Sequence, residues 1–219
     1  MSQPTDEEQR ISTYPVSFSV AYPELPLNRV TTAVRAVTAV PIMFLLVSLR
    51  AGPLPSTWSG LATSAGLALS GIGVLAIPVA LMLIVRQKYP RWWYDWNLEL
   101  LRFANRVMVY LALMTDRYPS TDEQQSVELN FPYPAPRTLS RGLPAIKWLL
   151  ATPHYFALAV LFIFVPFFLL AAWVSILITG RYPRPIFAYI EGVLRWGVRV
   201  TGYAYALVTD EYPPFSLGP

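Results

Sequence analysis

The sequence predicts a mainly α-helical integral membrane protein with about three transmembrane helices, interfacial amphipathic helices, short β-strands and an internal tandem duplication. The first observation is that 54% of the 219 residues are hydrophobic and only 14% are charged, against about 25% charged residues in a soluble domain. The second is that residues 36–49, 51–85 and 148–180 contain no Asp, Glu, Lys or Arg. The third is that the second half of the chain repeats the motifs of the first half in the same order.

The repeat is visible as identical residues at constant separations. Eight pairs differ by 93 positions: Tyr89/Tyr182, Pro90/Pro183, Arg91/Arg184, Leu101/Leu194, Arg102/Arg195, Arg106/Arg199, Val107/Val200 and Tyr110/Tyr203. Asp116/Asp210 and Tyr118/Tyr212 differ by 94, and upstream pairs such as Tyr22/Tyr133 and Arg35/Lys147 differ by 111 or 112. We therefore expect a polar N-terminal tail at 1–13, one repeat copy at 14–120 and a second copy at 121–219.

Each copy is expected to begin with a strand and a basic helix. Residues 16–22 and 127–131 alternate between apolar and polar side chains, which is typical of a half-buried strand. A proline follows each alternating segment and ends it, because proline cannot donate to a sheet. Basic helices are then expected at about 28–40 and 140–152.

The uncharged runs are expected to cross the membrane, since roughly 20 apolar residues span a core of about 30 Å. In copy one, a Pro- and Gly-rich stretch after Arg50 separates a short first run from a full span at 61–85. In copy two, residues 154–179 read as one span kinked at Pro166, with a re-entrant hairpin as the alternative. Basic residues flank both sides of this run, so the sequence leaves the orientation open.

An amphipathic helix with an arginine stripe ends each copy, at about 92–115 and 185–209. Three interpretations of these stripes remain open. They anchor the helices among lipid headgroups, they face each other across a polar groove that binds an anionic ligand, or the helices themselves span the membrane. The candidate side chains for lipid headgroups or small anions are Arg102, Arg106, Arg195, Arg199, Arg35 and Lys147, and the candidate ion-pair partners are Glu99 and Glu191.

Catalytic patterns are missing from the sequence. There is no cysteine and only one histidine, His154, which fits an interfacial position better than a zinc site that needs further ligands. Asp116 and Asp210 each stand near a Tyr-Pro pair, where turn chemistry explains an aspartate. No nucleotide-binding, serine-hydrolase or zinc-protease motif is present. We therefore expect no enzyme, no cofactor and no metal.

Copy two resembles a bacterial membrane family, the domain-of-unknown-function family 4389. The motifs that carry the resemblance are Pro153-His154-Tyr155, Thr179-Gly180-Arg181-Tyr182-Pro183, Leu194-Arg195-Trp196, Arg199-Val200, Tyr203, Thr209-Asp210 and Tyr212-Pro213-Pro214-Phe215. Copy one is degenerate, because it has Pro41-Ile42-Met43 and lacks Thr-Gly before its Tyr89-Pro90. The resemblance implies a membrane location and no assigned reaction.

These observations favour a non-catalytic accessory or scaffold subunit that binds a partner membrane complex or lipids. The alternative is lipid or small-anion binding or transport through a groove between the two copies. We expect a multi-pass protein of the bacterial inner membrane, with membrane lipids and a larger complex or a homo-oligomer as partners. The net charge of +4 is attributed to anionic headgroups rather than to nucleic acid, because the basic residues flank apolar runs.

Overall fold

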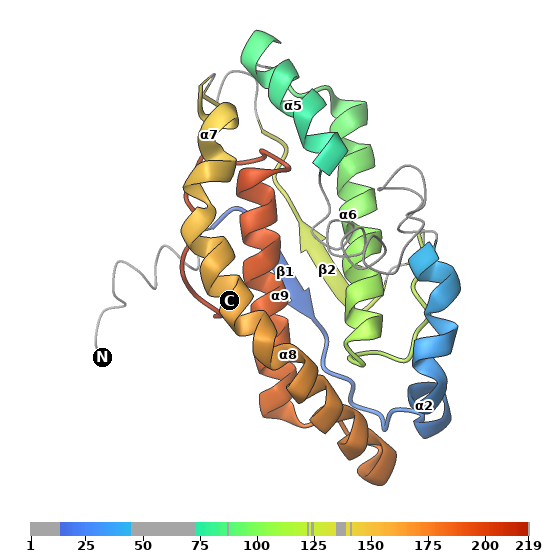
Figure 1. Ribbon diagram of the computed structural model, residues 1–219. Coiled ribbons are helices and arrows are strands. Elements are labelled where there is room, and N and C mark those ends of the chain that lie inside the picture. Colours follow the sequence, from blue (N-terminus) through green and yellow to red (C-terminus); the bar gives the residue numbers. More distant parts are fainter. Residues whose placement is uncertain are drawn as a thin grey trace, which may run out of the picture.

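The computed structural model describes residues 14–44, 73–86, 88–121, 123, 125–134, 139–140 and 142–218. Helices dominate these residues, as the sequence predicts, and two short strands accompany them (Figure 1). In chain order the elements are β1 (Ser17–Val20), α2 (Arg29–Thr38), α5 (Gly73–Arg86), α6 (Arg91–Leu111), β2 (Val127–Asn130), α7 (Leu143–Leu150), α8 (Thr152–Thr179) and α9 (Arg184–Ala204).

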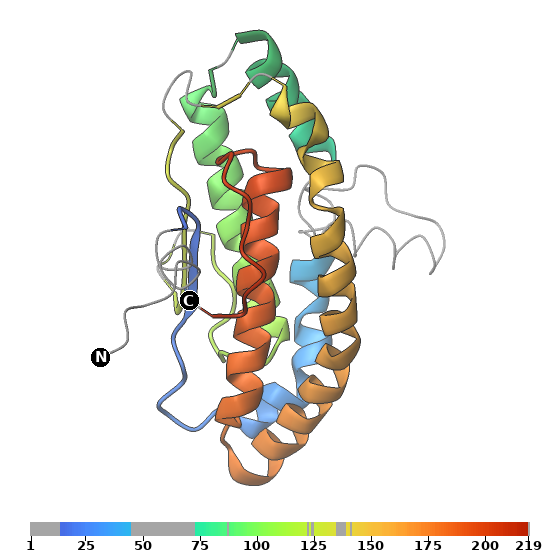
Figure 2. The same ribbon diagram turned by 90° about the vertical axis from the view of Figure 1, so that its left-hand side faces the viewer.

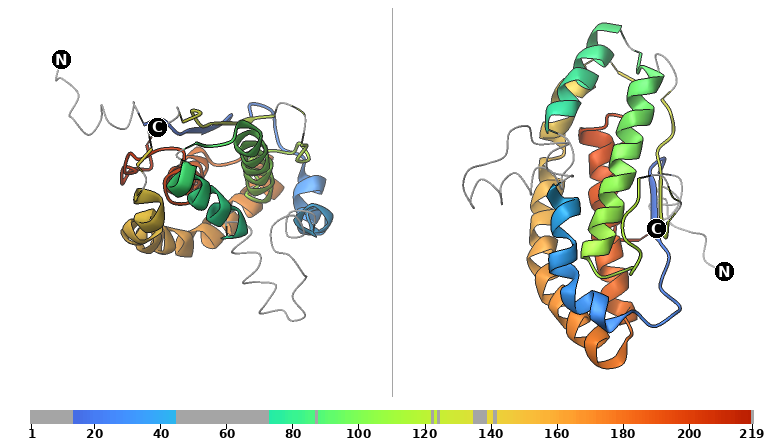
Figure 3. Two further views of the ribbon diagram at one scale, coloured as in Figure 1. Left: turned by 90° about the horizontal axis from the view of Figure 1, so that it is seen from above. Right: turned by 90° about the vertical axis from the view of Figure 1, so that its right-hand side faces the viewer.

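Three layers make up the molecule. The two strands form one side, α6 and α9 lie in the middle, and α8 and α2 cover the other side (Figures 2 and 3). Strand β1 packs against α9 and strand β2 packs against α6, so each strand contacts the long amphipathic helix of the other half of the chain. The middle helices therefore present one face to the strands and the opposite face to α8.

The strands pair in antiparallel register, with Phe18 opposite Leu129 and Val20 opposite Val127. These four side chains are buried and point toward α6 and α9, while the residues between them are exposed. The alternation predicted from the sequence is thus confirmed, because a two-stranded sheet with one covered face buries every second side chain. The strands are shorter than the alternating segments that predicted them.

Helices α6 and α9 end in matching ways. Leu113 and Leu207 adopt left-handed backbone conformations with φ of 64° and 55°. Such a conformation is uncommon for leucine, because its Cβ crowds the following carbonyl. Both side chains are buried in the core. Glycine would adopt this backbone conformation with less strain, but it would lose the core contacts of the leucine side chain.

Helix α8 is one continuous helix of 28 residues with Pro166 inside it. The interpretation as a single helix is confirmed, and the hairpin alternative is wrong for these residues. The left-handed Gly180 (φ 74°) ends the helix, and its carbonyl accepts a hydrogen bond from the Leu27 backbone N–H at 2.8 Å. This bond fixes the end of α8 next to the start of α2.

One helical stretch among the described residues, Leu143–Thr179, is long and apolar enough to cross a membrane. Only 11% of its most apolar window is buried by the rest of the protein. A core helix of a soluble protein would be mostly covered, and a continuous exposed apolar surface of this kind marks contact with lipid or a partner. Residues 45–72, which include the end of the predicted run at 36–49 and the first part of the run at 61–85, lie outside the described residues, so the count of three spans stays a prediction.

Candidate functional site

Two buried cations join the short basic helices to the ends of α6 and α9. Lys147, which is fully buried, forms an ion pair with Asp210 at 2.6 Å and donates a hydrogen bond to the Thr209 carbonyl at 2.6 Å. Arg35, 2% exposed, forms an ion pair with Asp116. Each short helix is thereby attached to the end of the long helix of its own half.

The second carboxylate oxygen of each aspartate binds the backbone just before the short basic helix. Asp116 Oδ2 accepts a hydrogen bond from the Asn28 backbone N–H at 2.6 Å, and Asp210 Oδ2 accepts one from the Ser140 backbone N–H at 2.7 Å. Burial alone would raise the pKa of Asp210, but the bonds from Lys147 and Ser140 and the charge of Lys147 lower it below its ordinary value. Asp116 and Asp210 therefore have structural partners, but these lie in distant segments and not in the local turns that the sequence suggested.

The arginine stripes of α6 and α9 lie against the strands. Arg102 Nε donates to the Leu129 carbonyl at 3.0 Å, and Arg195 Nε donates to the Phe18 carbonyl at 2.9 Å. Phe18 and Leu129 are the central cross-strand pair, so the two arginines bind the two outer edges of the sheet at equivalent points. The stripes do not face each other across a groove.

The predicted glutamate partners take part in the same arrangement. Glu99 pairs with Arg102 at 2.6 Å, and Glu191 pairs with Arg195. Glu191 also accepts a hydrogen bond from the Val20 backbone N–H at 3.2 Å. The side chains of α9 thus satisfy both a carbonyl and an N–H on the free edge of β1, where another chain could otherwise add a strand.

Arg106 and Arg199 are the most deeply buried members of the stripes. Arg106 donates to the Ser120 carbonyl at 2.7 Å, and Arg199 donates to the Ser216 carbonyl at 3.5 Å. Burial, and secondarily the charge of Arg195, lowers the pKa of Arg199. Of the predicted headgroup ligands, these two together with Arg35 and Lys147 are enclosed by the protein, and the binding of anions by any of the six stays a prediction.

His154 lies in the first turn of α8 and its ring is inside the protein, while its predicted position at the membrane interface stays a prediction. Its Nδ1 accepts a hydrogen bond from Trp196 Nε1 at 3.1 Å, and its ring stacks on Phe215 at a centroid distance of 3.9 Å. The histidine therefore holds the segment after α9 against α8 and α9. Among the described residues, no group of three His, Cys, Asp or Glu side chains could hold a metal ion.

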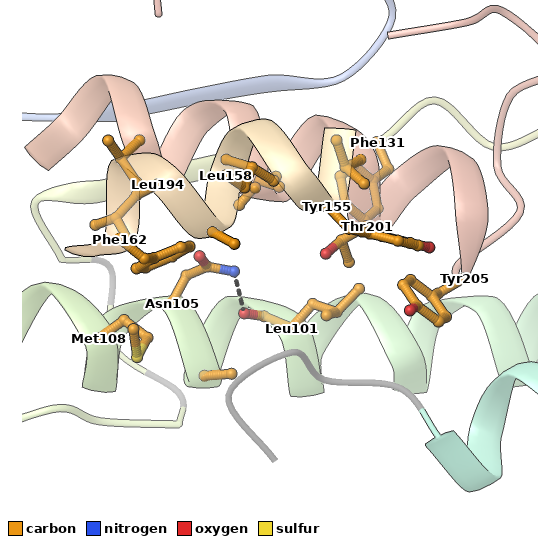
Figure 4. Close-up of a pocket in the computed structure, with 16 residues that line it drawn as sticks. Leu101, Asn105, Met108, Phe131, Tyr155, Leu158, Phe162, Leu194, Thr201 and Tyr205 are labelled. Carbon is orange, nitrogen blue, oxygen red and sulfur yellow. Dashed lines mark hydrogen bonds between the residues drawn. The ribbon is translucent and has the colours of Figure 1, made fainter. Parts of the chain in front are cut away.

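A cavity of about 480 Å³ lies between α6, α8 and α9 (Figure 4). Helix α6 lines it with Leu101, Ala104, Asn105 and Met108, at the i, i+3, i+4, i+7 spacing of one helix face. Helix α9 contributes Leu194, Gly197, Val198 and Thr201, each 93 positions after its counterpart on α6. Helix α8 closes the cavity with Tyr155, Leu158, Ala159 and Phe162.

The wall of this cavity is apolar, and none of the described residues that line it is charged. The small residues Ala104 and Gly197 stand at matching positions and leave the space open. A Cβ added at Gly197 would meet no atom within 4 Å. The sequence analysis missed this site because apolar residues at helical spacing also occur on an ordinary core-facing helix. The one available signal was that small residues, Ala104 and Gly197, stand 93 positions apart on the two long helices.

The comparisons with known proteins identify one family. The family model described as a domain of unknown function, DUF4389, matches residues 145–216. This range runs from α7 through α8 and α9 to the segment that packs on His154. Neither the curated proteins nor the solved structures contain a match. The second half of the chain is therefore similar to the DUF4389 family over residues 145–216, as the motifs around His154 and Tyr182 indicated.

Proposed function

We propose that this protein is a non-catalytic membrane protein that holds the hydrocarbon chain of a lipid in the cavity between its two halves. The observation that carries the proposal is the uncharged cavity between α6, α8 and α9. Its volume of about 480 Å³ falls within the range of roughly 300–1,000 Å³ that small-molecule sites occupy. A hydrocarbon chain satisfies an apolar wall without any counter-charge.

Matching contacts in the two halves support an internal duplication. Arg35–Asp116 corresponds to Lys147–Asp210, and Arg102 on Leu129 corresponds to Arg195 on Phe18. The hydroxyls of Tyr22 and Tyr133 follow the same rule, because each donates to the carbonyl of the tyrosine before the other half's long helix, Tyr182 and Tyr89. A cavity lined by equivalent positions of both copies is where duplicated membrane proteins often place a ligand.

The exposed apolar side chains of α8 support a membrane placement, in which lipid rather than water would solvate them. We propose a multi-pass protein of the bacterial inner membrane, in which α8 is one span and the uncharged runs of the first half supply the others. A lipid chain could then enter the cavity beside α8, because α8 forms one of its walls.

Filling the cavity tests the proposal. Gly197→Leu adds a side chain into open space, so the protein should fold and lose its lipid. The measurement is the number of lipid molecules retained per chain, by native mass spectrometry after extraction in mild detergent. Wild-type protein should retain one tightly bound lipid that Gly197→Leu lacks.

Ala188→Leu is the matched control, because Ala188 lies on the exposed side of the same helix. It places the same leucine side chain outside the cavity and should leave the retained lipid unchanged. Equal lipid content in wild-type and Gly197→Leu protein would show that the cavity does not hold the lipid.

A scaffold role is a second candidate, and one observation favours it. Helix α2 exposes Val30, Val34 and Val37 on its surface, which a helix of a partner membrane protein could cover. The strand edges favour this role less than the sequence alone did, because Arg102, Arg195 and Glu191 already bind them. Val37→Glu should release a partner that co-purifies with wild-type protein, and a chain that always purifies alone would contradict this role.

A further inference from the structure

Asn105 is a polar residue of the cavity wall whose hydrogen-bonding capacity is only half used. Asn105 donates from Nδ2 to the Leu101 carbonyl at 2.8 Å, one turn earlier on α6 (Figure 4). Its Oδ1 accepts no hydrogen bond from any residue that the structure describes, and the side chain lines the cavity. The amide oxygen is therefore an acceptor presented to whatever fills the space.

A neighbouring asparagine on the same helix shows the contrast. Asn97 makes the equivalent bond from Nδ2 to the Trp93 carbonyl at 2.9 Å, but its side chain does not line the cavity. Both asparagines thus bond their own helix, and of the two only Asn105 presents its amide oxygen to the cavity. A half-buried acceptor beside an apolar wall is stabilised by a donor from a ligand.

The absence of charge among the described residues of the cavity wall restricts which head group a ligand can carry. The predicted anion ligands on α6 and α9 are bound elsewhere: Arg102 and Arg195 donate to strand carbonyls, and Arg106 and Arg199 donate to the carbonyls of Ser120 and Ser216. A phosphate placed beside Asn105 would therefore lose its hydration without gaining a counter-ion, which is strongly unfavourable. A hydroxyl group loses far less hydration and supplies the donor that Asn105 lacks.

We infer that the cavity selects an uncharged lipid whose head donates a hydrogen bond to Asn105 Oδ1. This inference rests on the proposed function, because it requires that the hydrocarbon chain occupy the cavity between α6, α8 and α9. Thr201 on α9 also lines the cavity. The ligand class is thus a neutral amphiphile with a free hydroxyl, and not a phospholipid with its phosphate in the cavity.

Three probes with the same oleoyl chain test the inference on delipidated full-length protein. Monooleoylglycerol carries hydroxyl donors, methyl oleate carries none, and oleoyl lysophosphatidylglycerol carries a charged phosphate. Titration followed by native mass spectrometry should show monooleoylglycerol binding about tenfold more tightly than methyl oleate, the difference expected for one hydrogen bond. Lysophosphatidylglycerol should bind at least tenfold more weakly than monooleoylglycerol.

Asn105→Leu should remove the preference for monooleoylglycerol over methyl oleate, and Asn97→Leu should keep it. The comparison of the three probes on wild-type protein stands even if Asn105→Leu does not fold. Equal affinity for monooleoylglycerol and methyl oleate, with both lost in Gly197→Leu, would overturn this inference and leave the lipid-binding proposal intact. Preferred binding of lysophosphatidylglycerol would also overturn it. Binding of all three probes unaffected by Gly197→Leu would reject the cavity as the site.

Discussion

The ammonium group of Lys147 is buried, and Asp210 is the carboxylate that pairs with it. The lowered pKa of Asp210 means that the folded state prefers the ionised carboxylate more than the unfolded state does. This contribution is complete above the unfolded pKa of about 3.9 and is lost as the pH falls through the lower folded value. Ionised Asp210 should therefore stabilise the folded protein at neutral pH and not in strong acid, and it offsets the burial of Lys147, which lowers the pKa of that side chain.

Asp210→Asn should lower the free energy of unfolding by about 2 kcal/mol at pH 7, because Lys147 keeps its burial and loses its charged partner. The difference between variant and wild type should shrink as the pH falls below about 4. Chemical unfolding in detergent across this range measures it. Glu211→Gln, at the next position, is the control and should show no such pH-dependent gap; a constant gap for Asp210→Asn would contradict the account.

His154 provides a second prediction at this scale. His154→Phe preserves an aromatic ring against Phe215 but leaves the Trp196 indole N–H without its acceptor. An unsatisfied buried donor costs about 2 kcal/mol. Combining His154→Phe with Trp196→Phe, which has no N–H, should cost at least about 1 kcal/mol less than the sum of the single changes. Additive losses in thermal or chemical unfolding would show that the bond contributes nothing.

At the scale of elements, side chains of the Glu–Arg pairs on α6 and α9 form hydrogen bonds with the outer edges of β1 and β2, where a neighbouring strand would otherwise bind. Arg195→Met should leave the Phe18 carbonyl unpaired and accelerate hydrogen exchange in β1 and in the segment near Leu217, whose carbonyl also accepts from Arg195. Arg102→Met should act in the same way on β2. Exchange in α8 should stay unchanged in both variants.

Arg117→Met, at a side chain that is 63% exposed, is the control for both changes and should leave both strands protected. Exchange measured by mass spectrometry locates the effect by peptide. If Arg195→Met and Arg117→Met gave the same protection of β1, the edge bonds would be irrelevant to the sheet.

The sequence predicted the elements better than their contacts. Period-two alternation found both strands, and the charge-free run 154–179 found α8, because these patterns are local. The sequence could not predict that the arginine stripes face the strands. Arg102 and Arg195 bind backbone carbonyls of distant segments, and no local sequence pattern identifies which carbonyl an arginine will bind. The same limit hid the cavity, which exists only where α6, α8 and α9 meet.

At the scale of the whole molecule, the basic residues are arranged along the long axis. The α5–α6 and α8–α9 junctions lie at opposite ends of the molecule (Figure 1). The first junction carries Arg86, Lys88 and Arg91, and the second carries Arg181 and Arg184, all of them exposed. Cations at both ends of an apolar layer suit headgroups on both sides of a bilayer, which is why the positive-inside rule leaves the orientation open.

The depth of α8 in the bilayer tests the central claim most directly. Phe156, Ile163, Leu170 and Ile178 lie along its outer face and are 60–72% exposed, and the chain has no native cysteine. Spin labels on single cysteines at these four positions report lipid and water contact through collisions with oxygen and with a water-soluble nickel complex.

A spanning α8 predicts high oxygen and low nickel accessibility at positions 163 and 170, with nickel accessibility rising toward 156 and 178. Uniformly high nickel accessibility at all four positions in reconstituted bilayers would contradict it. An equal, shallow depth at all four positions would likewise show that α8 lies along the surface instead of crossing the membrane.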